Sequence, residues 1–263
     1  MTMDEKLKET LRALAEKYET EEFIDKDPSK FMHQIDDRKN QELVAFLSAN
    51  LAFGKREQIL GHIQLILDRS GNDMAKWIGD GKFRDFFPDN EKSFYRTYSN
   101  KTMLLFFETL KGILEESETL GEHARRTWES EKEKSGGFLH LAVAGLFPKE
   151  CTLLPHSADS AAKKVNMFLR WMCRTDSPVD LGLWTWHDRR KLLIPLDTHV
   201  MQEATRFNLI EANSKGKTKG ANLKTAVELT EKLSEVFPDD PVKGDFALFG
   251  LGVDGDRQSS TLG

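Results

Sequence analysis

The residue types best suited to chemistry lie in two short stretches of the 263-residue chain. Lys163 and Lys164 open a segment with the apolar spacing of a helix, and Asp197 follows the run Ile194-Pro195-Leu196, where another helix can begin. An amine and a carboxylate on two helix starts could meet at one site. Such a pair suits reaction at a sugar carbon, where the amine attacks and the carboxylate stabilises the developing positive charge.

Each of these residues also has a purely structural interpretation. Asp is a preferred helix N-cap because its carboxylate accepts the free amide protons of the first turn, so Asp197 could serve its helix alone. Adjacent residues on a helix point about 100° apart, so only one of Lys163 and Lys164 can face a given site. Both lysines could equally be solvated. His199 would lie in the first turn after Asp197, where a histidine is more often structural than catalytic.

Basic residues are concentrated in one part of an acidic chain. The net charge of −5 argues weakly against a nucleic-acid partner. Between Ser160 and Lys224, however, 12 Lys and Arg face 6 Asp and Glu, a balance of +6, whereas the remainder has 26 basic and 37 acidic residues, a balance of −11. A solvated basic face is one interpretation, and a phosphate-binding surface is the other. The candidate nucleic-acid contacts are Ser160, Arg170, Arg174, Trp184, Trp186, Arg189, Arg190 and His199, and residues 214–220 form a basic loop.

The apolar spacing predicts an all-α fold. Strand-like alternation and internal repeats are not found, and apolar residues recur every three or four positions in most segments. The expected helices are 40–52, 59–67, 102–114, 138–147, 163–172, 198–207, 223–236 and 242–252. A charged surface helix within 115–137 ends at Ser135-Gly136-Gly137, which predicts a boundary between an N-terminal helical part, 1–137, and a C-terminal part, 138–263. One integrated fold is the alternative.

Composition excludes several classes of protein. No apolar run reaches the roughly 18 residues that a membrane span needs, and the charged start of the chain lacks the apolar region of a signal peptide. Cys151 and Cys173, the only cysteines, are too few for a disulfide scaffold or a four-cysteine iron–sulfur cluster. We therefore expect a cytoplasmic monomer without a metal, a cofactor or a membrane partner.

The order of these parts resembles a known superfamily. A lysine-bearing helix, an apolar run and Leu196-Asp197-Thr198-His199-Val200 together resemble the helix-hairpin-helix DNA glycosylases, and 245–252 resembles the closing helix of their domain. Most of the chain is similar to a family of bacterial proteins, domain of unknown function 2400, through 163–172, 196–200 and 240–246. The resemblance implies a two-lobed helical fold with the site in a cleft between the lobes.

The resemblance also implies residue roles in a base-excision enzyme of DNA repair. Asp197 would stabilise the oxocarbenium-like sugar and could deprotonate the attacking amine or water. Lys164 is the favoured Schiff-base nucleophile, whose covalent intermediate would permit strand scission, and Lys163 is the alternative. The substrate would be damaged DNA, with RNA left open.

The interval between the lysines and Asp197 contains what looks like an insertion, 175–191. Its Trp184 and Trp186 could stack on an extruded base or simply pack a loop onto the domain. The alternatives to an enzyme are a non-catalytic nucleic-acid-binding module and a protein-interaction module on the same scaffold.

Overall fold

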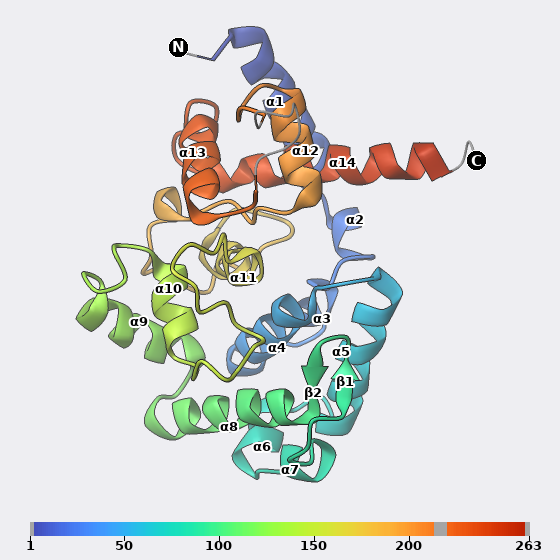
Figure 1. The fold of residues 1–263 in the computed structure, drawn as a ribbon, viewed down its shortest axis with the longest axis vertical. Helices are drawn as coiled ribbons and strands as arrows, with labels where there is room; N and C mark the ends of the chain where they lie inside the picture. Colours follow the sequence, from blue (N-terminus) through green and yellow to red (C-terminus); the bar gives the residue numbers. More distant parts are fainter. Residues whose placement is uncertain (1–2, 213–219, 261–263) are drawn as a thin grey trace. The chain divides into compact units, whose positions relative to one another are not determined.

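The computed structural model describes residues 3–212 and 220–260, and the chain forms two compact units. Unit 1 contains residues 1–23 and 157–263, and unit 2 contains residues 24–156. The prediction of an all-α fold is confirmed: the described part of the chain is mostly helical, with one small antiparallel hairpin of β1 (Ser93–Tyr95) and β2 (Tyr98–Ser99) (Figure 1).

Unit 2 is built around α4 (Arg38–Leu51), in which every residue from Glu42 to Leu51 is buried. Phe46 of α4 stacks on Phe106 with ring centroids 5.5 Å apart, and both rings lie against Phe147. Much of the phenylalanine of the chain therefore serves core packing. The other helices of this part are α3 (Lys30–His33), α5 (Arg56–Ser70), α6 (Met74–Gly79), α7 (Phe83–Phe86), α8 (Asn100–Glu116), α9 (Leu120–Glu131) and α10 (Leu139–Gly145).

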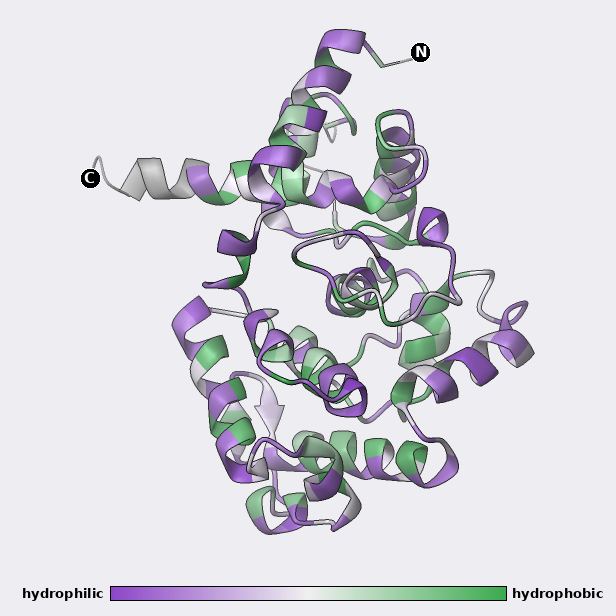
Figure 2. Ribbon diagram, turned by 180° about the vertical axis from the view of Figure 1, so that it is seen from behind, coloured by the Kyte–Doolittle hydropathy of each residue, from purple (hydrophilic) through white to green (hydrophobic). Residues whose placement is uncertain are grey.

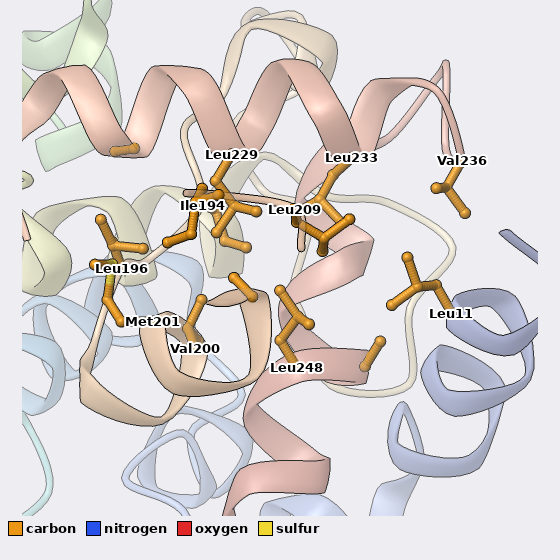
Figure 3. Close-up of a cluster of buried hydrophobic side chains, with 14 of the residues drawn as sticks. Leu11, Ile194, Leu196, Val200, Met201, Leu209, Leu229, Leu233, Val236 and Leu248 are labelled. Atoms are coloured by element: carbon orange, nitrogen blue, oxygen red, sulfur yellow. The ribbon is translucent and has the colours of Figure 1, made fainter. Parts of the chain in front are cut away.

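Unit 1 joins the two ends of the chain. Its helices are α1 (Glu5–Tyr18), α11 (Lys163–Cys173), α12 (Thr198–Arg206), α13 (Leu223–Ser234) and α14 (Gly244–Ser260), with 3₁₀ turns at Arg189–Lys191 and Pro241–Lys243. The short α2 (Glu21–Ile24) lies where unit 1 passes into unit 2. Apolar side chains from α1, α12, α13 and α14 converge on the segment before Asp197, with Leu11, Ile194, Val200, Leu229 and Leu248 all pointing into one cluster (Figure 3).

Two glycines allow α14 to be approached closely by its neighbours. A Cβ added at Gly250 would lie 2.3 Å from the Tyr18 ring of α1, and one at Gly252 would lie 2.8 Å from Cβ of His199 on α12. The packing of α1 and α12 against α14 therefore depends on the absence of a side chain at these positions. Because α12 begins directly after Asp197, this packing also holds the candidate site.

The division of the chain differs from the boundary expected at residue 137. Ser135-Gly136-Gly137 forms a turn within unit 2, with φ of +60° at Gly136 and +80° at Gly137, and the helices that it connects, α9 and α10, pack on each other. The units instead divide after residue 156, and residues 1–23 belong with the C-terminal part.

The helices are amphipathic rather than uniformly apolar. Purple and green segments alternate along α1 and α8 in Figure 2, as expected for helices that bury one face. Within residues 3–212 and 220–260, no helix combines the length and apolar character needed to cross a bilayer. Nor do three or more His, Cys, Asp or Glu side chains gather in this part of the chain in a way that could hold a metal ion.

Candidate functional site

Asp197 is the N-cap of α12, as its position after Ile194-Pro195-Leu196 predicts. Its Oδ1 accepts a hydrogen bond of 2.9 Å from the backbone N–H of Val200. This bond fixes the orientation of the carboxylate and leaves Oδ2 for another partner. The capping interpretation of Asp197 is therefore correct, and it does not exclude a chemical role.

The second oxygen of Asp197 meets the first lysine of the pair. Lys163 Nζ lies 3.1 Å from Asp197 Oδ2, and the Asp197 side chain is only 10% exposed against 35% for Lys163. Lys163 is the first residue of α11, and the residue before it, Ala162, has a left-handed backbone with φ of +44°. The structure thus brings together Asp197 and Lys163, whereas the sequence favoured Lys164.

His199 lies on the same side of the carboxylate. Its Nδ1 is 3.7 Å from Asp197 Oδ2, and its ring meets Phe249 of α14 edge-on at 5.8 Å. The close approach of Gly252 to Cβ of His199 fixes this part of α12. His199 is therefore a neighbour of the Lys163–Asp197 pair.

A buried carboxylate that the sequence analysis did not select lies behind this pair. Asp245, in the first turn of α14, accepts a hydrogen bond from Nη1 of Arg170, whose Nε lies 3.3 Å from Asp180 Oδ1. Burial raises the pKa of Asp245 to about 6; the Arg170 and Lys163 cations oppose this rise, while Asp197 adds to it. The charges of Lys163 and Asp197 therefore influence the ionisation of Asp245.

Arg174 extends this system away from the site. It is buried and contacts three carboxylates: Asp180, Asp240 at 2.8 Å and Glu19 at 2.7 Å. Burial opposes the charge of Arg174, but the carboxylates outweigh it and raise the pKa of the guanidinium. Arg170 and Arg174 were expected to contact nucleic acid. Their side chains are instead enclosed and ion-paired, so we assign them to the interior of unit 1.

The two tryptophans of 175–191 differ in burial, and Trp184 is enclosed as Arg170 and Arg174 are. Trp184 is fully buried, with its ring edge-on to Phe168 at 5.1 Å and stacked on Trp186 at 5.5 Å. The packing interpretation therefore applies to Trp184, which has no exposed face for a base. Trp186 is half-buried and lies over Trp184.

Arg189 and Arg190 also have partners within the chain. Arg189 donates to the backbone carbonyl of Asp239 at 3.1 Å and to that of Thr175 at 3.2 Å. Arg190 is exposed and binds the carboxylate of Asp188, with its Nη2 2.9 Å from Oδ2. Both arginines are therefore held by local acceptors, although Arg190 remains open to solvent.

The turn before α11 differs from a glycine-rich phosphate-binding hairpin. The amide of Ser160 donates to the Ser157 carbonyl at 3.1 Å, and Ser160 Oγ accepts from the amide of Ala162 at 3.1 Å. Ser160, predicted to contact nucleic acid, thus stabilises its own turn. Residues 146–162, all of them described, form no helix, so α10 and α11 do not flank this turn directly. The basic loop at 214–220 lies almost wholly outside the described residues.

Comparison with protein families gives a clear result. Residues 27–254 match the family described as "Protein of unknown function (DUF2400)". The chain belongs to this family. The match includes Lys163, Asp197 and Asp245, so the candidate site lies within the matched residues. No curated protein and no solved structure matches the chain.

Proposed function

We propose that this protein is a base-excision enzyme that cleaves the N-glycosidic bond of a damaged nucleotide in DNA. The observation that carries the proposal is the 3.1 Å contact between Lys163 Nζ and Asp197 Oδ2, with Asp197 fixed by its bond to the Val200 amide. An amine and an oriented carboxylate are the two groups that this reaction needs. The resemblance to helix-hairpin-helix glycosylases supports the proposal from the sequence.

The proposed roles follow from the geometry. As the bond from C1′ to the base breaks, its electron pair leaves with the base, and Asp197 stabilises the positive charge that develops on the sugar. The departing base takes a proton, which the Lys163 ammonium supplies, and the neutral amine then adds to C1′; Asp197 Oδ2 is positioned to accept the proton that this nitrogen next loses. The nitrogen lone pair then forms the C1′=N bond of the Schiff base as the C1′–O4′ bond breaks, and O4′ takes the proton from Asp197. Abasic-site cleavage can follow. In this assignment Lys163 replaces Lys164 as the nucleophile.

A second candidate is a non-catalytic module on the same scaffold. An ion pair between the starts of α11 and α12 also braces two helices, and such a pair needs no substrate. The partners found for Arg170, Arg174 and Arg189 reduce the cationic surface that either candidate could offer to phosphates, so they do not decide between the two. A binding module should associate with DNA without forming a covalent bond to it.

Borohydride trapping on duplexes with varied lesions and abasic sites distinguishes the two candidates. The wild-type chain should form a covalent adduct and release a base from at least one lesion. Asp197→Asn should lower base release by about 100- to 1,000-fold, the usual effect of removing one preorganised electrostatic group. Asn caps a helix as well as Asp, so stability is kept. Binding without any adduct or base release on the whole panel would establish the non-catalytic module instead.

A further inference from the structure

Two charged groups of unit 1, Arg170 and Asp245, lie behind the Lys163–Asp197 pair. Lys163 and Arg170 are seven residues apart on α11, which places them two turns apart on one face of the helix. Arg170 donates to Asp245, and its guanidinium carbon also lies 4.3 Å from the centre of the Phe246 ring, so Arg170 contacts two successive residues at the start of α14. The same helix, α14, packs on α12, which Asp197 caps.

We propose that Asp245 is a positioning residue for the Lys163–Asp197 pair: its ion pair with Arg170 ties α11, which carries Lys163, to α14, which packs on the helix that Asp197 caps. An ionised Asp245 holds Arg170 and so keeps the pair in place, whereas a neutral Asp245 loosens this tie and weakens the site. This inference rests on the proposed function for its catalytic consequence. The coupling of Asp245 to Lys163 and Asp197 can nevertheless be measured without a substrate.

The groups that face Asp245 determine the pH at which this change occurs. They are Arg170 and Lys163 on α11, Asp180 in the following loop and Asp197 at the start of α12. Burial is the largest influence and raises the pKa of Asp245 to about 6, above the range of an exposed carboxyl. Asp245 is therefore neutral below this pH and charged above it. Base release should consequently increase as the pH rises through about 6.

The coupling is tested by NMR on the full chain labelled with ¹³C at the aspartate carboxyl carbons. Asp245→Glu keeps a carboxylate for Arg170 and removes one aspartate signal, which assigns the resonance. We expect a wild-type midpoint near pH 6. Asp197→Asn should lower it because a like charge is lost, and Lys163→Gln should raise it because an opposite charge is lost. The exposed Asp239→Asn, which removes the same charge as Asp197→Asn, should leave the midpoint unchanged.

The catalytic consequence is tested by the pH profile of base release. Asp245→Asn should lose the increase near pH 6 and release base about tenfold more slowly than wild type at pH 8, whereas Asp245→Glu should restore the increase. A loss of packing alone would lower the rate at every pH and leave the increase in place. That result, or a midpoint of Asp245 that neither Asp197→Asn nor Lys163→Gln shifts, would overturn the inference. Inactivity of the wild type on every lesion would overturn the proposed function, while the NMR titration would still decide the coupling.

Discussion

At the scale of single residues, the choice between two adjacent lysines decides the proposed mechanism. The sequence predicts that only one can face Asp197, but the helical phase of α11 is fixed by the backbone that precedes it. Ala162 adopts a left-handed conformation directly before Lys163, and in this arrangement Lys163 Nζ lies 3.1 Å from Asp197 Oδ2. A left-handed alanine is rare and has no signature in the sequence. The sequence therefore predicts that one of the two lysines meets Asp197, but it does not predict which one.

The contact of Lys163 with Asp197 gives a direct prediction for covalent trapping of the protein on DNA. Lys163→Gln should abolish the borohydride adduct on abasic DNA because the amine beside Asp197 is lost, and Lys164→Gln should retain it. The two variants remove the same charge from neighbouring positions, so each is the control for the other. Gel shift after borohydride treatment measures the adduct, with binding checked without reductant. Loss of trapping in Lys164→Gln alone would return the nucleophile to Lys164.

The buried arginines make a second prediction at this scale, on stability. Arg174→Met keeps the approximate volume of the side chain but leaves Asp180, Asp240 and Glu19 without their common cation. Removing one member of a buried ion network usually costs about 3–5 kcal/mol. We therefore expect unfolding at clearly lower denaturant concentration, monitored by circular dichroism. Arg190→Met, at an exposed pair, should leave the denaturation midpoint nearly unchanged. If the two substitutions changed stability equally, the buried ion pairs of Arg174 would not be important for the stability of the fold.

At the scale of elements, the sequence predicts the helices better than it predicts the contacts between them. The 3.6-residue period identified α4, α5, α8, α11, α12, α13 and the start of α14, because each buries one stripe. The buried arginines have a usable signal in the sequence: Arg170 and Arg174 are spaced by four, on α11 and its C-cap, among the apolar residues of that helix. Their partners could not be predicted, because Glu19, Asp240 and Asp245 are brought to α11 only by tertiary packing.

The approach of α12 to α14 can be tested at Gly252. Gly252→Ala places a methyl group 2.8 Å from Cβ of His199, so one helix must move. We expect a loss of about 1–3 kcal/mol, as for other overpacked positions, and a lower rate of base release because α12 carries Asp197 at its start. Gly61→Ala, in α5 with no atom near the added methyl, should instead stabilise by about 0.5–1 kcal/mol. Denaturation of both variants measures the difference. A neutral Gly252→Ala would mean that α12 tolerates the displacement.

At the scale of the whole molecule, the charge asymmetry has an internal explanation. The positive balance of 160–224 suggested a surface for phosphates. In the structure Arg170 and Arg174 neutralise acids that lie outside this segment, in α14, before α14 and after α1. A count of charges along the sequence cannot distinguish such compensation from an exposed patch, since the partners are distant in the chain. The boundary expected at residue 137 likewise differs from the units of the structure, because residues 1–23 join the C-terminal part only through tertiary packing.

This explanation predicts how DNA binding responds to salt. Arg190 is exposed but bound to Asp188, so Asp188→Asn should release a cation and remove an anion. Affinity for duplex DNA should then increase, and the slope of log affinity against log salt should steepen by about 1, the value for one added phosphate contact. Asp89→Asn removes an equal charge from an exposed position in unit 2 and should leave the slope unchanged. Fluorescence anisotropy over a salt series measures both. An unchanged slope in Asp188→Asn would place Arg190 outside the DNA contact.

The pairing of α1 with α14 has a consequence for how the chain is made. More than two hundred residues separate Tyr18 from the start of α14, so at about 5–20 residues per second α1 waits tens of seconds on the ribosome for the helix that covers it. Residues 24–156 are complete well before then and can fold as synthesis continues. During this interval Leu11 and Ala15, fully buried in the finished protein, are open to chaperones and to other nascent chains. Because unit 1 is discontinuous in sequence, it can assemble only after α14 has been synthesised.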